Sequence, residues 1–228
     1  MEFLAVALED YYLNALKSKF IFFRHCLQKE YNGLRLNFDL GIYFRSLSDL
    51  DPLERKLIDL SYGKILDVGS NTGYYIPYLM KKGPTIGIEI SPRINSIARK
   101  EGLMNCVIGD IFKYNFYKLF DTITLIGNDI ALSGTLLRLR KLLKKLKKLL
   151  NEDGQVLLII SHIRTLKYWH AIYTPWYDKK LGIPFKILFL NVFYFIKLSM
   201  KNGFRATIHG KYKSKGNMFY LVRLVKSS

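Results

Sequence analysis

Three acidic residues and one glycine-containing turn have the types and spacing of a nucleoside-binding site. The turn spans residues 67–73, with the sequence DVGSNTG, and ends a short apolar segment. Such a turn brings backbone N–H groups and a helix N-terminus close to an anionic or polar ligand. Glu89 lies 20 residues after Gly69, where a carboxylate can accept both hydroxyls of a ribose. Asp110 lies 21 residues after Glu89, where a carboxylate can accept the exocyclic amine of adenine.

Neighbouring residues add to this candidate site. Ile90 and Ile111 directly follow two of the acids and could sandwich the adenine ring, and Gly127-Asn128 lies at the exit of a further apolar segment. A nicotinamide or flavin site would need Gly-x-Gly-x-x-Gly, but Asn71 and Tyr74 occupy its second and third glycine positions. That fingerprint is therefore excluded, and the turn is instead Asp-x-Gly-x-x-x-Gly.

The elements that must position these residues alternate between strands and helices. Apolar runs predict strands at 64–68, 85–90, 106–109, 120–126 and 155–161. Helical periodicity, caps and glycine stops predict helices at 52–61, 75–82, 92–101, 136–150 and 192–201. Residues 204–213 and 218–226 read as a closing hairpin. We therefore expect a doubly wound, Rossmann-like α/β sheet of seven strands with an antiparallel last pair, and the acids at its carboxyl edge.

The first 60 residues have a different pattern. From Phe3 to about Glu30 the apolar residues recur at helical spacing, which predicts one or two amphipathic helices. We expect residues 1–60 to form an N-terminal helical cap and residues 61–228 to form the ligand-binding domain. The cap fits either a lid over the site or a dimer surface, and the sequence does not decide between them or indicate an oligomeric state.

The chain resembles the class I S-adenosylmethionine-dependent methyltransferases. The resemblance rests on residues 65–75, 85–92 and 109–111, together with the segment 120–128 and the final hairpin, and covers about residues 43–228. It implies methyl transfer from S-adenosylmethionine, which leaves S-adenosylhomocysteine, in the Rossmann-like fold of that family and without a metal.

The resemblance also implies roles for individual residues. It puts Asp67, Gly69, Ser70 and Gly73 near the methionine moiety, Glu89 on the ribose and Asp110 near the adenine. It adds Tyr43, Asn71, Ile90, Ile111, Gly127 and Asn128 to the cofactor-binding set, with Tyr43 as an aromatic that closes over the cofactor. Asn71 departs from the family, which usually has glycine there, but asparagine tolerates the left-handed backbone conformation better than most residues.

The methyl acceptor is less well indicated. Adenine and cytosine amino-methyltransferases carry an Asp/Asn-Pro-Pro-aromatic turn after the fourth strand, whereas residues 127–130 here are GNDI. This favours a small-molecule acceptor, and the positive charge of the chain raises the question whether that acceptor or another partner is anionic. An RNA methyltransferase is the alternative, since residues 131–228 hold 20 basic and 3 acidic side chains out of 36 and 18 in the chain. A non-catalytic cofactor-binding protein with the same fold is a third possibility.

Most candidate residues for catalysis and substrate binding follow the fifth strand, and Arg45, before the first strand, is the exception. His162 directly follows that strand and titrates near neutral pH, so it is a candidate general base, although it also fits an ordinary loop histidine. Arg45, Arg164, Tyr168 and Trp176 are candidate substrate contacts. The aromatic segment around Tyr168 and Trp176 fits a pocket wall and the packing of a long connection equally well.

The remaining composition narrows the setting. The net charge of +18 is concentrated after residue 130, and helix 136–150 carries seven basic residues around a leucine stripe. We favour a solvated outer face for these residues over a phosphate-binding one. Cys26 and Cys106 form neither a disulfide framework nor a zinc pattern, and the N-terminus lacks the basic region of a signal peptide. We therefore expect a cytoplasmic protein.

Overall fold

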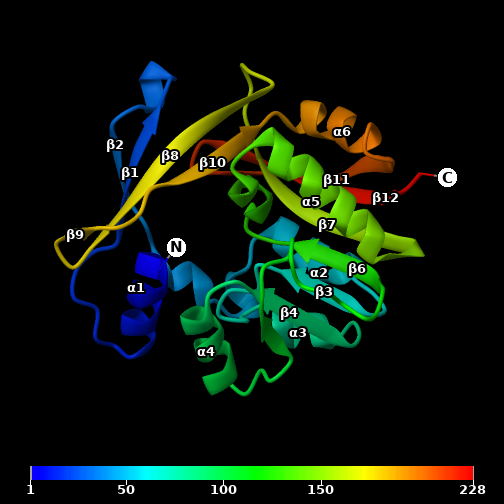
Figure 1. The fold of residues 1–228 in the computed structure, drawn as a ribbon, viewed down its shortest axis with the longest axis horizontal. Coiled ribbons are helices and arrows are strands. Elements are labelled where there is room, and N and C mark those ends of the chain that lie inside the picture. The colour runs from blue at the N-terminus through cyan, green and yellow to red at the C-terminus, as the bar shows by residue number, and fades with distance from the viewer. Residues whose placement is uncertain (1, 228) are drawn as a thin grey trace.

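The computed structural model describes residues 2–227, and its central feature is one mixed β-sheet (Figure 1). Seven strands lie in the order β5-β4-β3-β6-β7-β12-β11. Their bounds are β3 Ile65–Val68, β4 Thr85–Glu89, β5 Cys106–Ile108, β6 Phe120–Leu125, β7 Leu150–His162, β11 Phe204–Ser214 and β12 Asn217–Lys226. The first five are parallel, and β12 runs antiparallel to both β7 and β11. The predicted doubly wound sheet with an antiparallel last pair is confirmed.

Side chains of β7 show why both faces of the sheet are covered. Val156, Leu158 and Ile160 pack in the cluster that contains the apolar residues of α5 and α6. Leu157 and Ile159, which alternate with them, pack on the opposite face against α2 and α3. Because successive residues of a strand point to opposite faces, a continuous apolar run requires a helical layer on each side.

The helices begin where the sequence supplies caps. They are α2 Pro52–Leu60, α3 Ile76–Met80, α4 Pro92–Lys100, α5 Leu136–Leu149 and α6 Val192–Met200. The Asp51 carboxylate accepts the backbone N–H groups of Leu53 and Glu54 at the start of α2. Ser91 and Thr135 cap α4 and α5 in the same way. Each cap satisfies an N–H that the helix itself leaves without a partner, which anchors the helix start next to its strand.

The N-terminal segment corrects one prediction. Glu2–Tyr12 is a helix, α1, but Ile21–Cys26 and Leu34–Asn37 are strands β1 and β2, so the helical prediction to Glu30 is wrong beyond α1. The strand forms because β1 pairs along its whole length with β8, about 150 residues later in the chain. Local periodicity carries no information about such a partner. The division of the chain at residue 60 stays a prediction.

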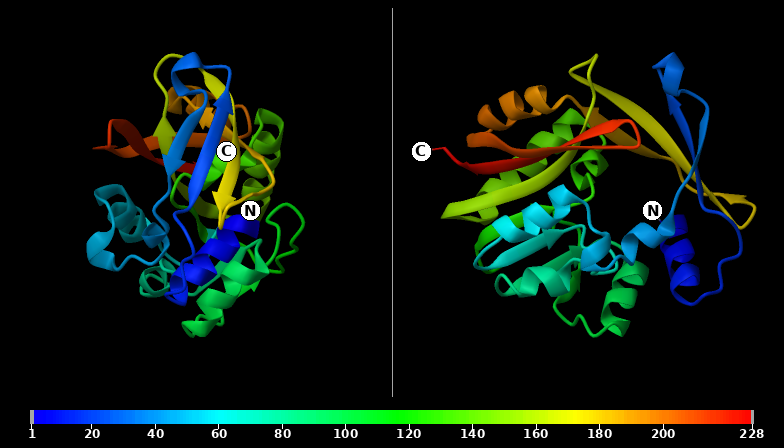
Figure 2. Two further views of the ribbon diagram at one scale, coloured as in Figure 1. Left: turned by 90° about the vertical axis from the view of Figure 1, so that its left-hand side faces the viewer. Right: turned by 180° about the vertical axis from the view of Figure 1, so that it is seen from behind.

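The aromatic segment after β7 is itself a set of strands. These are β8 Tyr168–Tyr177, β9 Lys180–Leu181 and β10 Phe185–Leu190. With β1 and β2 they form an arm beside the core sheet, joined to it where Leu190 pairs with the last residue of β7 (Figure 2). Rings of Phe22, Phe38, Tyr173 and Phe185 pack edge to face inside the arm. Below it, α1 contacts α4. Of the helices in residues 2–227, none combines the length and the apolar character needed to cross a bilayer.

Candidate active site

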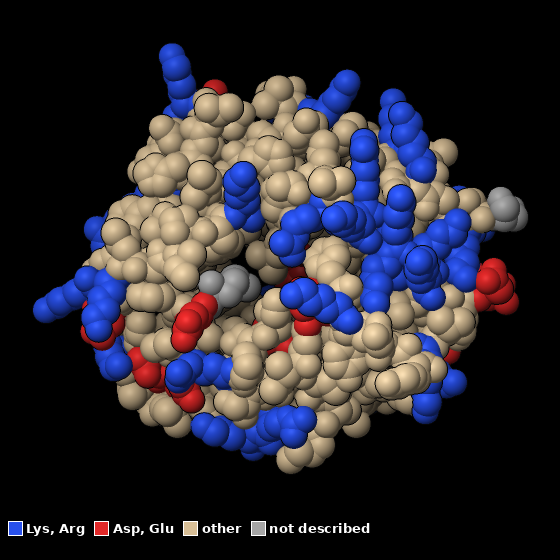
Figure 3. Space-filling view, in the orientation of Figure 1, with Lys and Arg blue, Asp and Glu red and all other residues tan. Residues whose placement is uncertain are grey.

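A cavity of about 480 Å³ lies at the carboxyl ends of β3, β4, β5 and β6. Figure 3 shows a hollow near the centre of the molecular surface, with acidic side chains inside it and basic side chains at its rim. Its lining includes Gly69, Glu89, Ile90, Asp110 and Ile111. Five residues predicted from the sequence, drawn from three strand ends, therefore line one space, as expected for ligand sites of open α/β sheets.

Glu89 is held in place by the turns on either side of it. It is 5% exposed, and its Oε2 accepts the backbone N–H of Asn71 (3.2 Å) while Oε1 accepts that of Ser91 (2.8 Å). Burial raises the pKa of this carboxyl, and the backbone N–H groups of Ser91, Asn71 and Ile90 oppose that rise. Each oxygen keeps a free lone pair, so the carboxylate can accept two further hydrogen bonds, one per oxygen.

Asp67 offers an oxygen that nothing in the described chain occupies. Its Oδ1 accepts the hydroxyl of Thr124 at 2.7 Å, whereas Oδ2 is buried without a hydrogen-bond partner. Burial raises the pKa of Asp67 to about 6, with a smaller contribution from Glu89. A buried acceptor without a partner costs free energy, and Asp67 itself is 2% exposed and does not line the cavity.

Asp129, in the 3₁₀ turn η4 (Asp129–Ser133), is a functional candidate that the sequence analysis passed over. It lines the same cavity, and a Cβ on Gly69 would lie 3.1 Å from its Oδ2. Burial raises the pKa of Asp129 well above its usual range, and the charges of Asp67 and Glu89 raise it further. In the sequence, Asp129 is marked only by its position shortly after β6. Its proximity to Gly69 appears only in the folded chain.

The turn between β3 and α3 needs residues that accept unusual backbone angles. Gly69 and Gly73 have φ of 78° and 82°, and Asn71 has φ of 51°. All three residues are therefore left-handed, and Asn71 adopts this conformation as expected for an asparagine. At Gly73 a Cβ would also lie 2.5 Å from the Leu103 side chain. Ser70 faces away from the cavity, since its side chain lies where a Cβ on Gly87 would be.

The adenine end of the predicted site is formed by the loop after β5. Oδ1 of Asp110 accepts the backbone N–H of Phe112 at 2.9 Å, which fixes the loop. Ile90 is 54% exposed and, like Ile111, lines the cavity, so two apolar side chains flank this end. The guanidinium of Arg138 lies 5.0 Å above the ring of Phe112.

Seven predicted cofactor residues do not line the cavity, and they are Asp67, Ser70, Asn71 and Gly73 of the turn together with Tyr43, Gly127 and Asn128. Tyr43 is partly buried, its carbonyl accepts the hydroxyl of Thr72, and burial, then the Asp129 charge, raise the pKa of its phenol. Gly127 and Asn128 both have left-handed φ, of 75° and 69°. The Oδ1 of Asn128 accepts a backbone N–H from the end of β7 at 3.0 Å, so this pair shapes the exit of β6.

Arg45 is occupied by partners within the fold. Its guanidinium forms a two-bond pair with Glu54 (3.0 and 2.7 Å) and donates to the backbone carbonyl of Ile42 and to the hydroxyls of Tyr74 and Tyr75. The structure therefore does not bring Arg45 into the cavity, and its contacts join the segment before α2 to the turn after β3.

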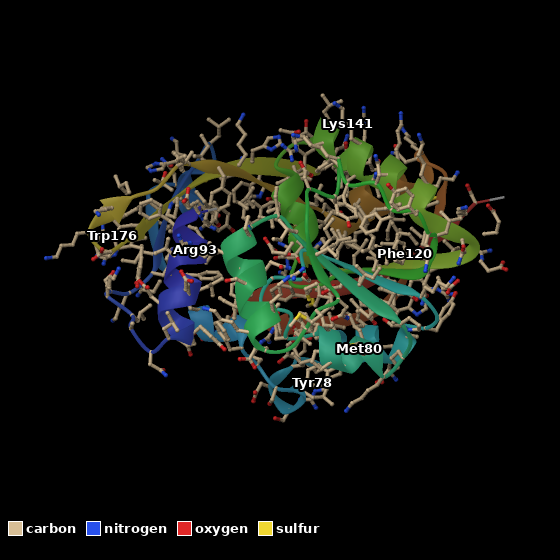
Figure 4. The ribbon with its side chains drawn as sticks, turned by 60° about the horizontal axis from the view of Figure 1, so that its bottom comes forward. Tyr78, Met80, Arg93, Phe120, Lys141 and Trp176 are labelled. Atoms are coloured by element: carbon tan, nitrogen blue, oxygen red, sulfur yellow. The ribbon has the colours of Figure 1, made fainter. Side chains whose placement is uncertain are left out.

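The structure also keeps the other sequence candidates apart from the cavity lining. The Nδ1 of His162 accepts the backbone N–H of Val192 at the start of α6, and its ring packs against Phe193 and Tyr220. Burial lowers the pKa of His162, and the Arg164 charge adds to that effect. Arg164 is exposed in the turn after β7, Tyr168 stacks on Tyr194, and Trp176 lies at the outer end of β8 (Figure 4). Within residues 2–227, no group of three or more His, Cys, Asp and Glu side chains is placed to hold a metal ion.

Comparison with solved structures identifies the fold. A methyltransferase from Bacteroides fragilis, described as S-adenosylmethionine-dependent and solved with S-adenosylhomocysteine, is 23% identical, with a TM-score of 0.84 over 99% of this chain and 94% of that one. The sugar N-methyltransferase KedS8 from a Streptoalloteichus species is 14% identical, with a TM-score of 0.59 over 85% and 94%. The amino pentose methyltransferase CalS10 from Micromonospora echinaspora is 14% identical, with a TM-score of 0.57 over 83% and 98%.

No protein-family model matches the sequence, and the search of curated proteins found no relative. At the identities of the structural neighbours, the likeness shows the fold. The chain has the Rossmann-like fold of S-adenosylmethionine-dependent methyltransferases, as the sequence resemblance implied.

Proposed function

We propose that this protein is an S-adenosylmethionine-dependent methyltransferase that acts on a small-molecule acceptor. The observation that carries the proposal is the convergence of Glu89, Asp110 and the Gly69 turn on one cavity at the carboxyl edge of the sheet. Asp110, Glu89 and the Gly69 turn stand at the ends of the neighbouring strands β5, β4 and β3, in the same order as the adenine, ribose and methionine groups of that cofactor. The fold alone would not choose between functions, but the site supplies chemistry that this cofactor needs.

The residues present fit the cofactor in three ways. Glu89 has a free lone pair on each oxygen for the two ribose hydroxyls. The unpartnered Oδ2 of Asp67 suits an ammonium donor. Gly69 has no Cβ, and the space that a Cβ would fill, next to the Asp129 carboxyl, stays open. A ligand can therefore approach the backbone of the turn. Ile90 and Ile111 supply apolar walls.

The chemistry of such a site is mainly alignment and electrostatics. When bound, S-adenosylmethionine supplies an electrophilic methyl group on a positively charged sulfur. Burial raises the pKa values of Asp67 and Asp129 and so disfavours their charged forms, and a cationic ligand would offset that cost by favouring the carboxylates. Holding the acceptor in line with the methyl group supplies most of the rate enhancement. Asp129 lines the cavity and, in its ionised form, is a candidate to accept a proton from the acceptor as it is methylated.

Two features support a small acceptor. The cavity is bounded by Phe185 and Lys186 of the β10 arm as well as by the core, so its walls come from two sides. Two of the structural neighbours are described as a sugar and an amino pentose methyltransferase. We further infer that residues 1–60 act as a lid on a catalytic domain of residues 61–228, because β1 and β2 complete that arm.

A labelled-methyl transfer assay tests the proposal. The chain is incubated with methyl-labelled S-adenosylmethionine and, separately, a metabolite extract and total RNA, with Glu89→Ala as the inactive control. We expect label in the small-molecule fraction, with at least a tenfold loss for the variant. Label found in RNA alone would show that RNA, and not a small molecule, is the acceptor. Cofactor binding without transfer to either fraction would favour the non-catalytic alternative.

A further inference from the structure

The part of the cavity formed by α5 and β10 is lined by two cations, both of them exposed. Arg138 comes from the first turn of α5 and Lys186 from β10, 48 positions later in the chain, yet both line the same cavity. Neither is among the ion pairs of residues 2–227. Arg138 is held over the ring of Phe112, which keeps its guanidinium at the cavity. Two unpaired cations in one concave space favour an anionic group.

The backbone at this end also favours an anion. Helix α5 has 14 residues, and its first turn contains no acidic side chain to offset the positive end of its dipole. Thr135 caps the helix and, like Arg138, lines the cavity. The backbone of Lys186 lies close to Gly134, because Gly134 has no Cβ. A Cβ at this position would lie 3.0 Å from the Lys186 carbonyl oxygen.

A buried serine gives an independent indication of a ligand. Ser133 is 4% exposed and lines the cavity, and its hydroxyl has no hydrogen-bond partner within the described chain. A hydroxyl buried without a partner is costly, so a group that accepts its proton would lower the free energy of this site. Ser133 is adjacent to the Gly134-Thr135 step that leads into α5, beside the two cations.

We propose that the methyl acceptor carries an oxyanion, a phosphate or a carboxylate, which binds Arg138, Lys186 and Ser133 at the N-terminus of α5. The inference rests on the proposed function, which assigns the carboxylate-lined end of the cavity to the cofactor. The cofactor's own carboxylate belongs to its methionine end, at the Gly69 turn. The two cations are therefore left for the acceptor, and arginine suits two-bond recognition of either oxyanion.

The rest of α5 is a separate surface and supplies the control. Arg140, Lys141, Lys144 and Lys148 are exposed, as Arg138 and Lys186 are, and they differ from those two in lying outside the cavity lining. Figure 4 shows Lys141 on the outer side of the helix. They contribute to the same positive field at a distance but do not line the cavity.

The test uses inorganic phosphate and acetate as probes of the anion site. Each is titrated calorimetrically into the full chain, with and without S-adenosylhomocysteine. We expect Arg138→Gln/Lys186→Gln to bind the preferred probe at least about tenfold more weakly than wild type, and Ser133→Ala about threefold more weakly. The matched control Arg140→Gln/Lys141→Gln removes the same charge from α5 and should stay within about twofold of wild type.

The outcomes separate this proposal from the proposed function. Binding of neither probe to wild type, or equal weakening in the control, would overturn the anion site. A parallel loss of S-adenosylhomocysteine affinity in Arg138→Gln/Lys186→Gln would show that the cations serve the cofactor, which would also overturn it. Failure of wild type to bind S-adenosylhomocysteine would remove the proposed function, and titration of the ligand-free chain would still decide whether the anion site exists.

Discussion

Replacing Asp67 by Asn should stabilise the protein at neutral pH while it weakens cofactor binding. Burial raises the pKa of Asp67 from 3.8 to about 6, so the charged form is disfavoured in the folded chain. A shift of about two units corresponds to about 3 kcal/mol of differential stability. Because the folded-state pKa is the higher one, the stabilising contribution is complete below about pH 3.8 and is lost as the pH rises through about 6.

Asp67→Asn keeps an oxygen for the hydroxyl of Thr124 and removes the charge. Its amide would be as unpartnered as the present Oδ2, so we expect a gain of about 1–3 kcal/mol in the free energy of unfolding at pH 8. For a chain of this size, that is a rise of roughly 2–12 °C in Tm. Urea denaturation of both chains at a series of pH values from 4 to 8 measures the difference.

The pH course is the decisive feature of that experiment. The stability difference should be small near pH 4 and should grow between pH 4 and 7. Parallel stability curves for the two chains, or a variant less stable at pH 8, would refute the assignment of a buried, destabilised carboxylate. Calorimetry with S-adenosylhomocysteine should meanwhile show weaker binding to the variant, because a ligand donor would meet an amide in place of the free oxygen.

Three further predictions concern Gly69, which lines the cavity, and Arg45 and His162, which lie outside it. Gly69→Ala should lower S-adenosylhomocysteine affinity at least about tenfold, through its φ of 78° and the 3.1 Å approach to Asp129; unchanged affinity in calorimetry would contradict this. Arg45→Gln should cost about 3 kcal/mol of stability in urea, because Glu54 stays buried without its cation, and Arg45→Met/Glu54→Leu should recover most of it. His162→Ala should lower Tm without changing turnover per folded molecule, since its ring supports the start of α6; a lower turnover at normal Tm would favour the general-base role.

The core of the fold is readable from local signals, and the arm is not. Strands such as Phe120–Leu125 and capped helices such as Pro52–Leu60 combine apolar runs with stop signals that are adjacent in sequence. The strand Ile21–Cys26 depends on pairing with Ala171–Trp176, a contact that no local pattern encodes. Its apolar residues fit a helix face as well as a strand, and the distant partner decides.

The site divides in the same way. Glu89 and Asp110 were found because strand ends recur at regular intervals and parallel strands bring their carboxyl ends together. Asp129 and Ser133 lie in a short 3₁₀ turn whose relation to Gly69 and β10 exists only in three dimensions. Arg45 looked available as a substrate contact because the sequence does not show that Glu54 lies within 2.7 Å of it.

Binding of S-adenosylhomocysteine to the purified chain tests the central claim most directly. Isothermal titration should show one site, with Glu89→Ala at least tenfold weaker (about 1.4 kcal/mol) because both ribose hydroxyls lose their acceptor. Asp59→Ala, which removes an exposed surface carboxylate paired with Lys82, should bind as wild type does. No heat of binding to wild type, or equal affinity for wild type and Glu89→Ala, would contradict the assignment of this cavity to the cofactor.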